Sequence, residues 1–296
     1  MAVCLVFKYK KIIIEKSIYR SLIMVSTMVK RAFLLVFFSF LTTAFLLAQQ
    51  GVTDNNSSGI NSISKKPYAG EMVEYGYKNV KGYLSLSKRA KKNKAVPAIV
   101  LIHEWWGLND DIKLYADQFA QKGYAALAID LYEGKNTTDP KQAGEFAGKV
   151  RENNDPAFAN INAALDFLRG KTYVDNNRLA AVGWCFGGAW SYRIALNDMG
   201  VRASVIYYGA FQPEDDLSKM RATILGHFAE KDAVIKIDDV KVFSVKLASQ
   251  NRDHDIFIYP NTTHGFARQG EHANRDDKAA KKAWKRTLRF LKKNLD

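Results

Sequence analysis

Short apolar runs alternate with longer segments of helical periodicity along residues 67–296. Runs typical of buried strands lie at 98–102, 125–129, 178–182, 204–208, 222–228 and 255–259. Helices are predicted at 111–122, 156–169, 189–196, 237–250 and 277–295. Two earlier strands, at 71–76 and 80–86, form an antiparallel leading pair. This alternation favours an α/β fold, with a mostly parallel central sheet and helices on both faces.

The N-terminal part of the chain follows a different pattern. Residues 32–48 are almost wholly apolar, follow the basic pair Lys30-Arg31 and end at the small residue Ala48. This order is typical of a secretory signal peptide, and the apolar stretch is short for a membrane span of about 20 residues. We expect a leader at 1–48, with the signal peptide at 28–48, Met28 as the true start and cleavage near Ala48.

The predicted leader is followed by a spacer and one domain, and it indicates the compartment in which the protein works. Residues 49–66 are polar and rich in Asn and Ser, which indicates a flexible spacer. Residues 67–296 then form one domain, because no linker interrupts the strand–helix alternation. We expect this domain to be extracytoplasmic, either periplasmic or secreted, with no stable membrane anchor.

The segment Gly183-Trp184-Cys185-Phe186-Gly187-Gly188 carries the strongest chemical signal in the chain. It joins a predicted strand to a predicted helix, which is the context of the G-x-nucleophile-x-G elbow. Glycines are needed there because the turn is strained and the backbone approaches closely. The dipole of the helix favours a thiolate at Cys185, which makes this residue a candidate nucleophile. The alternative is a buried structural cysteine.

An elbow nucleophile needs a base and an acid that orients the base. Asp232 and His264 each lie just past a predicted strand and follow Cys185 in the order acid, then histidine. Two rival bases are weaker candidates. His227 lies inside an apolar strand pattern, which predicts a core residue, and His103 ends a strand at a position that shapes the oxyanion loop.

The loop that begins at His103 contains a second candidate acid. Glu104 lies between this histidine and two tryptophans, where it either faces the thiol or points to solvent. In an elbow hydrolase this loop supplies one oxyanion N–H, and the residue after the nucleophile, here Phe186, supplies the other.

Five blocks of the sequence, in this order, resemble the dienelactone hydrolases, which are cysteine members of the α/β-hydrolase superfamily. The resemblance covers about residues 71–295. The blocks are Glu104-Trp105-Trp106-Gly107, Gly123-Tyr124-Ala125-Ala126 leading into Asp130-Leu131-Tyr132, Gly183–Gly188, Asp232, and His264-Gly265-Phe266-Ala267-Arg268.

The resemblance implies an α/β-hydrolase fold and a Cys-His-Asp triad of Cys185, His264 and Asp232. It also implies that Glu104 holds the resting thiol and takes its proton when substrate binds. We therefore expect an enzyme that cleaves ester or lactone bonds of small substrates through a thioester intermediate.

The resemblance further implies oxyanion-hole N–H groups at Trp105 and Phe186 and a substrate-carboxylate site at Arg268. A second family arginine is missing, and Lys141 or Arg151 is its candidate replacement. Lysine lacks the planar fork that binds a carboxylate bidentately. The substrate is therefore less well defined than the chemistry.

Charge and composition limit the kinds of partner that this protein is expected to bind. The formal net charge is +14, but no nucleic-acid-binding motif accompanies it, and the lysines of the last predicted helix fit a solvated face. The aromatic residues around the motifs, Trp106 among them, suggest an aromatic-lined substrate pocket. Of the two cysteines, Cys4 leaves with the leader, so no internal disulfide is expected. We expect a monomer without metal or cofactor.

Two alternatives stay open at this point. The first is a broad-specificity carboxylesterase or deacetylase that is not specialised for dienelactone. The second is a non-catalytic binding or redox-thiol protein on the same scaffold, because fold alone does not imply function.

Overall fold

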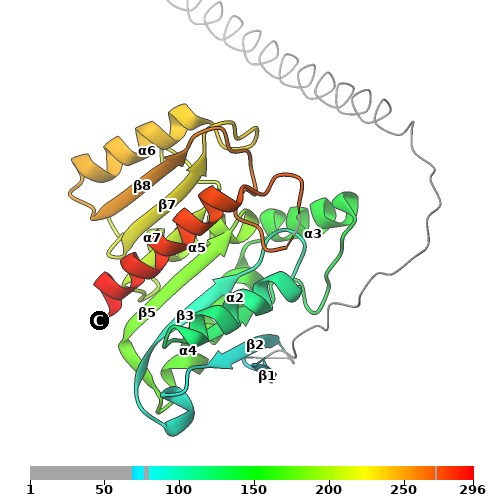
Figure 1. The fold of residues 1–296 in the computed structure, drawn as a ribbon, viewed down its shortest axis with the longest axis vertical. Helices are drawn as coiled ribbons and strands as arrows, with labels where there is room; N and C mark the ends of the chain where they lie inside the picture. The colour runs from blue at the N-terminus through cyan, green and yellow to red at the C-terminus, as the bar shows by residue number, and fades with distance from the viewer. Residues whose placement is uncertain (1–68, 77–79, 271) are drawn as a thin grey trace, which may run out of the picture. The chain divides into compact units, whose positions relative to one another are not determined.

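The structure, a computed structural model, describes residues 69–76, 80–270 and 272–296. The predicted leader at 1–48, its signal peptide and the spacer at 49–66 lie outside the described residues. Within them, eight strands form one sheet in the order β1-β2-β4-β3-β5-β6-β7-β8. Figure 1 shows this sheet with helices packed on it.

The sheet combines an antiparallel edge with a parallel body. β1 pairs with β2, and β2 with β4, in antiparallel register, whereas every pair from β4 through β3 and on to β8 is parallel. This confirms the predicted fold class and the antiparallel leading pair. The strands are β1 Glu71–Glu74, β2 Lys81–Leu86, β3 Val96–Ile102, β4 Ala125–Ile129, β5 Val174–Trp184, β6 Ala203–Tyr207, β7 Thr223–Ala229 and β8 His254–Tyr259.

Helices cover both faces of the sheet. One core contains residues of α2 and α7, which lie in front of the sheet in Figure 1, and the other contains residues of α3, α4, α5 and α6. Successive residues of β3 alternate between the two cores, as the period of two in a strand requires. The helices are η1 Ala90–Lys92, α2 Asp110–Gln121, α3 Pro140–Glu152, α4 Asp155–Arg169, α5 Phe186–Leu196, α6 Ile237–Ser249 and α7 Asp277–Leu295.

Helix α3 is absent from the set of helices predicted above. Gly144 and Gly148 lower its intrinsic helix propensity, which hides it in the sequence. The start of the helix is nevertheless well specified, because the Asp139 side chain caps it and Pro140 stands at its first position. Tertiary packing of its alanine face completes the helix.

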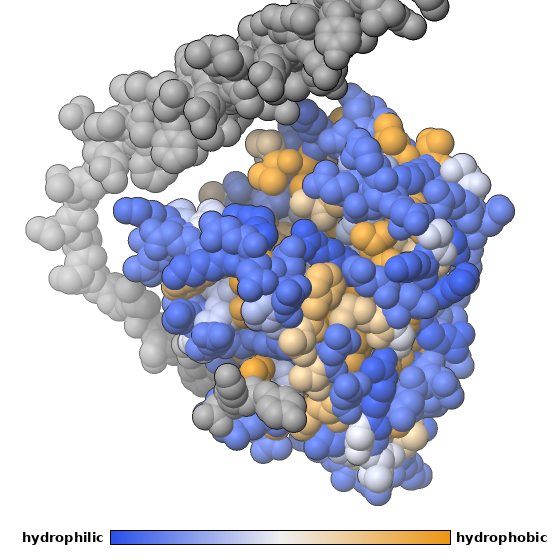
Figure 2. Space-filling model, turned by 180° about the vertical axis from the view of Figure 1, so that it is seen from behind, coloured by the Kyte–Doolittle hydropathy of each residue, from blue (hydrophilic) through white to orange (hydrophobic). Residues whose placement is uncertain are grey.

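The face of the domain that is seen from behind is mostly hydrophilic (Figure 2). Figure 2 shows the side of the molecule opposite to Figure 1, where apolar residues form a strip between hydrophilic ones. No helix of the described residues is long and apolar enough to cross a membrane.

The parallel body brings the candidate site residues to one edge. Glu104, Cys185, Asp232 and His264 follow the ends of β3, β5, β7 and β8, respectively. Because parallel strands all end at the same edge, four segments far apart in the sequence meet there.

Candidate active site

Cys185 occupies a strained turn between β5 and α5. Its φ is 53°, a left-handed conformation that is uncommon for residues with a side chain. The Cys185 N–H donates to the Tyr207 carbonyl at 2.9 Å, and its own carbonyl accepts from the Ala189 N–H at 3.1 Å. A Cβ on Gly183 would meet the Gly187 carbonyl, and one on Gly187 would meet the Ile102 carbonyl. The glycines of the motif are therefore needed for the backbone to pack this closely.

Cys185, His264 and Asp232 form a continuous relay. The Cys185 Sγ lies 3.1 Å from His264 Nε2, and His264 Nδ1 lies 2.9 Å from Asp232 Oδ2 and 3.1 Å from Oδ1. The Asp232 side chain is fully buried. Its Oδ1 also accepts from the N–H groups of Val234 and Ile235 at 2.8 and 3.0 Å. The loop after β7 therefore holds the carboxylate rigidly behind the imidazole.

The surroundings of His264 favour its protonated form. Burial acts to lower the pKa of the imidazole, but the hydrogen bonds to Asp232 and Cys185 outweigh it and raise the pKa from 6.5 to about 10. A cationic imidazole lies beside Sγ, where it stabilises the negative charge that forms on sulfur during the reaction.

Glu104 is buried and faces a different partner from the one expected. Its Oε2 lies 2.9 Å from Arg268 Nε, and its Oε1 accepts from the Tyr208 hydroxyl at 3.3 Å. The thiol is instead held by His264. The Nε–H of Arg268 makes no aligned hydrogen bond, so charge rather than a directed bond holds the Glu104–Arg268 pair. Burial raises the pKa of Glu104 to about 7, against the opposing effect of Arg268.

Arg268 lies between two carboxylates and above an aromatic ring. Its Nη2 is 4.0 Å from Asp111 Oδ2, and that same oxygen is 3.5 Å from His272 Nε2. The guanidinium carbon lies 5.2 Å from the centre of the Trp106 ring. Arg268 and Trp106, both predicted to bind substrate, are thus brought together at the edge of the site.

The loop that contains Trp105 is held in place by His103. The His103 Nδ1–H donates to the Glu104 carbonyl at 2.6 Å, and its Nε2 accepts from the Leu131 N–H at 3.1 Å. Neither the Trp105 N–H nor the Phe186 N–H donates to another group among the described residues. For Phe186 this follows from its place at the start of α5, where an α-helix leaves its N–H groups free.

Another candidate from the sequence lies in the core. His227 is fully buried and hydrogen-bonded to Thr287 and Tyr259, and burial lowers its pKa to about 3. It is the packed core histidine that its sequence context predicts.

Two neighbours of the site were missed by the sequence reasoning. Tyr208 follows β6 directly, has a φ of 40° and packs its ring 5.1 Å from the ring of His264. Its place at the end of a parallel strand was an available signal. Asp111, in the first turn of α2, had no such signal, because its contact with Arg268 depends on folding.

The described residues contain no group of three histidine, cysteine or acidic side chains arranged to hold a metal ion.

Comparison with known proteins identifies the family of the chain. The model of the dienelactone hydrolase family matches residues 80–295, which include every residue of the relay and its surroundings. The chain belongs to the dienelactone hydrolase family. It is a carboxylic ester hydrolase by that membership.

Relatives of known sequence align over nearly their whole length. The chain is 33% identical to "Protein usf" of Aquifex pyrophilus over 235 residues, covering 76% of this chain and 99% of the relative. It is 29% identical to a putative carboxymethylenebutenolidase of Aquifex aeolicus strain VF5 over 234 residues, again covering 76% and 99%.

Solved structures agree with the fold. A putative dienelactone hydrolase from Klebsiella pneumoniae superposes with a TM-score of 0.65 at 25% identity, covering 75% of this chain and 98% of that one. A dienelactone hydrolase-like promiscuous phosphotriesterase from metagenomic libraries gives a TM-score of 0.70 at 22% identity, covering 77% and 98%. The second likeness shows the α/β-hydrolase fold alone.

Proposed function

We propose that this hydrolase cleaves small esters or lactones, carboxylate-bearing ones included, through a Cys185-His264-Asp232 triad and a thioester intermediate. The observation that carries the proposal is the continuous contact from Sγ through the imidazole to a buried carboxylate. A nucleophile, a base and a group that orients the base are the parts that covalent acyl transfer needs.

Substrate binding frees the thiol proton in this proposal. A substrate carboxylate competes with Glu104 for the Arg268 guanidinium. Glu104, whose pKa of about 7 suits proton exchange at neutral pH, then takes the proton of Cys185. The Trp106 ring helps to position the substrate over Arg268.

Acylation follows by attack of the thiolate on the carbonyl carbon. The new C–S bond pushes the carbonyl electron pair onto oxygen, where the N–H groups of Trp105 and Phe186 stabilise the oxyanion. The oxyanion collapses, the C–O bond breaks, and the protonated His264 gives its proton to the departing alkoxide. The product is a thioester on Cys185 with a neutral imidazole beside it.

Deacylation uses the neutral imidazole. His264 takes a proton from water, the hydroxide attacks the thioester carbonyl, and the C–S bond breaks to release the acid. The proton held on Glu104 then returns to the thiolate. Asp232 keeps the imidazole in one tautomer throughout, because its carboxylate accepts from Nδ1–H.

The names of the relatives and the basic residues of the site both bear on the substrate class. The relatives include carboxymethylenebutenolidases and a probable lactonase of Bradyrhizobium, which favour a lactone or a similar ester. The missing second arginine argues for a broader range of esters. Burial raises the pKa of the Tyr132 hydroxyl, and Arg151, one of the two candidate replacements, is close enough to oppose that rise. The other candidate, Lys141, is exposed near the start of α3.

Location and assembly belong to the same proposal. The signal-peptide pattern at 28–48 supports an extracytoplasmic enzyme, cut near Ala48. We propose that the enzyme acts on small molecules, is a monomer and does not bind nucleic acid. A non-catalytic thiol protein is the weaker alternative, because it would not need a buried aspartate behind the histidine.

The test compares hydrolysis of p-nitrophenyl acetate, p-nitrophenyl butyrate and a dienelactone by the wild type and Cys185→Ala. We expect Cys185→Ala to lose turnover on all three, with unchanged circular dichroism. His264→Gln should lower kcat/KM at least about a thousandfold. His254→Gln, at the other end of β8 from the site, should leave kcat/KM unchanged. Turnover retained in Cys185→Ala would overturn the triad.

A further inference from the structure

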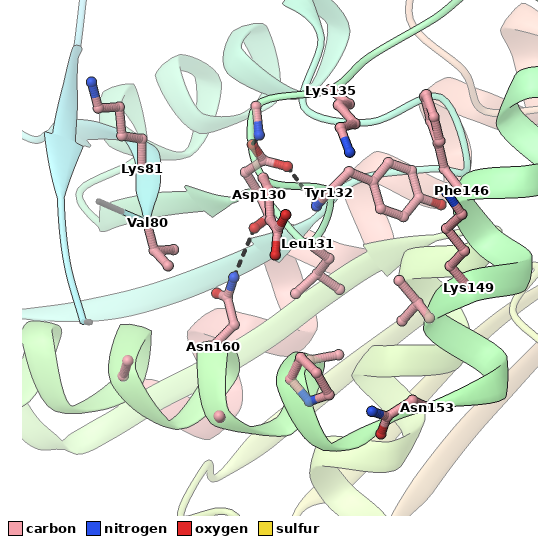
Figure 3. Close-up of a pocket in the computed structure, with 17 residues that line it drawn as sticks. Val80, Lys81, Asp130, Leu131, Tyr132, Lys135, Phe146, Lys149, Asn153 and Asn160 are labelled. Atoms are coloured by element: carbon pink, nitrogen blue, oxygen red, sulfur yellow. Dashed lines mark hydrogen bonds between the residues drawn. The ribbon is translucent and has the colours of Figure 1, made fainter. Parts of the chain in front are cut away.

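A cavity of about 1110 Å³ lies next to the site, and Cys185 is not among the residues that line it. Its walls come from the start of β2, the loop after β4, and helices α3 and α4. Leu131, Phe146 and Val150 make much of its surface apolar. Figure 3 shows the space between these elements, with Tyr132 at one wall.

Tyr132 connects this cavity to the residues around the nucleophile. Its ring centre lies 5.4 Å from that of Phe186, the residue that follows Cys185, and 4.6 Å from that of His103. The side chain also lines the cavity. One aromatic side chain therefore reaches from the surroundings of the nucleophile to the cavity.

The Tyr132 hydroxyl is a buried donor without an acceptor. The residue is only 5% exposed, and its oxygen has no hydrogen-bond partner among the described residues. Burial raises the pKa of this hydroxyl well above its ordinary range, so it keeps its proton. A buried hydroxyl that is left unpaired costs free energy, which a bound acceptor would recover.

Two lysines without an ion pair lie on the wall of the cavity. Lys135 and Lys149 line it, and neither forms an ion pair within the described part of the chain; Figure 3 shows both near the Tyr132 ring. Asp130 and the exposed Glu133 also line the cavity, and Asp130 accepts from the N–H groups of Tyr132 and Gly134. Lys81, the third lining lysine, is paired with Glu74. Lys135 and Lys149 are therefore the lining lysines that can pair with an anionic ligand.

We propose that this cavity binds the part of the substrate remote from the scissile bond, and that this part is an apolar chain or ring that ends in a carboxylate. Lys135 and Lys149 hold the carboxylate, and the Tyr132 hydroxyl donates a hydrogen bond to it. The inference rests on the proposed function only in taking Cys185 as the point of attack. This carboxylate, at the far end of the acyl chain, is distinct from one close to the scissile bond, which binds Arg268. The substrate class is then a medium-sized amphipathic ester.

Binding tests the cavity without any turnover. Octanoate and the uncharged octanamide are titrated calorimetrically into the full chain, using the wild type and Cys185→Ala. We expect octanoate to bind both proteins and octanamide to bind more weakly. Tyr132→Phe and Lys149→Glu should each weaken octanoate binding about three- to tenfold. Lys94→Glu, the same charge change in the exposed loop before β3, should leave it unchanged.

A second variant fills the cavity from its rim. Ala159 is exposed on α4 and lines the cavity, so Ala159→Trp places a large ring there without disturbing the core. Octanoate binding should be lost in this variant. Binding that survives Ala159→Trp, Tyr132→Phe and Lys149→Glu but is lost in Arg268→Met would overturn the proposal, because the ligand would then occupy the Arg268 site alone.

Kinetics separate this inference from the proposed function. For mono-p-nitrophenyl suberate, Lys149→Glu and Tyr132→Phe should raise KM about three- to tenfold with kcat unchanged, while p-nitrophenyl acetate is unaffected. Equal effects on both esters, or none on either, would overturn the cavity assignment and leave the triad standing. Octanoate binding without Cys185-dependent turnover would instead overturn the triad and support the cavity.

Discussion

The Glu104 carboxylate is exposed to two opposing influences. Burial favours its protonated form and raises its pKa to about 7, whereas the Arg268 guanidinium favours the anion. Glu104 therefore gains a proton more readily when the Arg268 guanidinium moves away from it. A single pair of side chains can therefore couple substrate binding to activation of the thiol.

Replacing Arg268 by methionine tests this coupling. Without the cation the pKa of Glu104 should rise above about 7, so the acid limb of the pH–rate profile should move to higher pH. Turnover of carboxylate-bearing esters should fall about 10- to 100-fold, and neutral esters should lose less. The measurement is kcat/KM from pH 5 to 9. An unchanged acid limb would contradict the role of Arg268.

The His264–Asp232 pair makes a prediction about stability. The pKa of His264 is about 10 in the folded protein against an ordinary 6.5, so the folded state binds the proton more tightly. The resulting stabilisation is complete below pH 6.5 and is lost as pH rises through 10. Urea unfolding of wild type and Asp232→Asn should therefore differ most at pH 6 and least at pH 10.

The matched control for that experiment is Asp238→Asn. Asp238 pairs with Lys241 on the exposed face of α6, where solvent screens the interaction. Its effect on unfolding should be small and nearly independent of pH over this range. A pH-independent effect of Asp232→Asn as well would show that the pair does not shift the proton affinity of His264.

At the level of elements, the junction of β5 and α5 places the nucleophile. The strand ends at Trp184, the helix begins at Phe186, and Cys185 alone makes the turn between them. Helix α5 is buried along most of its length and lies against β5, β6 and β3. The nucleophile is therefore fixed by two well-packed elements rather than by a flexible loop.

Two glycine substitutions distinguish a glycine that is needed for close packing from one that only lowers helix propensity. Gly187→Ala places a Cβ against the Ile102 and His103 carbonyls, so it should lower the free energy of unfolding by about 3 kcal/mol or more and abolish turnover. Gly148→Ala, in α3, meets no atom within 4 Å and should stabilise by about 0.5–1 kcal/mol with activity kept. Denaturant titration and esterase assay measure both; a harmless Gly187→Ala would refute the close approach.

On the scale of the whole molecule, positive charge is concentrated on one helix. The formal net charge is +14, and α7 presents seven exposed basic residues on the face away from the sheet. These are Lys278, Lys281, Lys282, Lys285, Arg289, Lys292 and Lys293. The summed field of such a distribution attracts anionic ligands before any contact forms.

Salt should reveal this attraction. Between about 20 and 500 mM NaCl the Debye length falls from about 20 Å to about 4 Å, so kcat/KM for an anionic ester should drop several-fold. Hydrolysis of neutral p-nitrophenyl acetate should stay nearly constant over the same range. Equal salt dependence for both substrates would exclude electrostatic steering.

Local backbone conformation and strand order are predictable from the pattern of residues. Apolar runs marked the parallel strands, and Gly183 with Gly187 marked the turn, because only glycine tolerates such close backbone contacts. The same pattern predicted that Cys185, Asp232 and His264 would meet, since each follows a strand of one parallel sheet. Helix α3 was not predicted, because its glycines lower the helix propensity of the segment and its stability comes from packing and capping.

Which side chains touch at that edge depends on how distant segments of the chain pack together. Glu104 and Arg268 are 164 positions apart, and their pairing depends on the directions of side chains from two separate loops. The contacts of Tyr208 and Asp111, and the cavity behind Tyr132, likewise arise from surfaces that the fold brings together. Backbone pattern is a local property, whereas electrostatic partners and empty space exist only between distant segments.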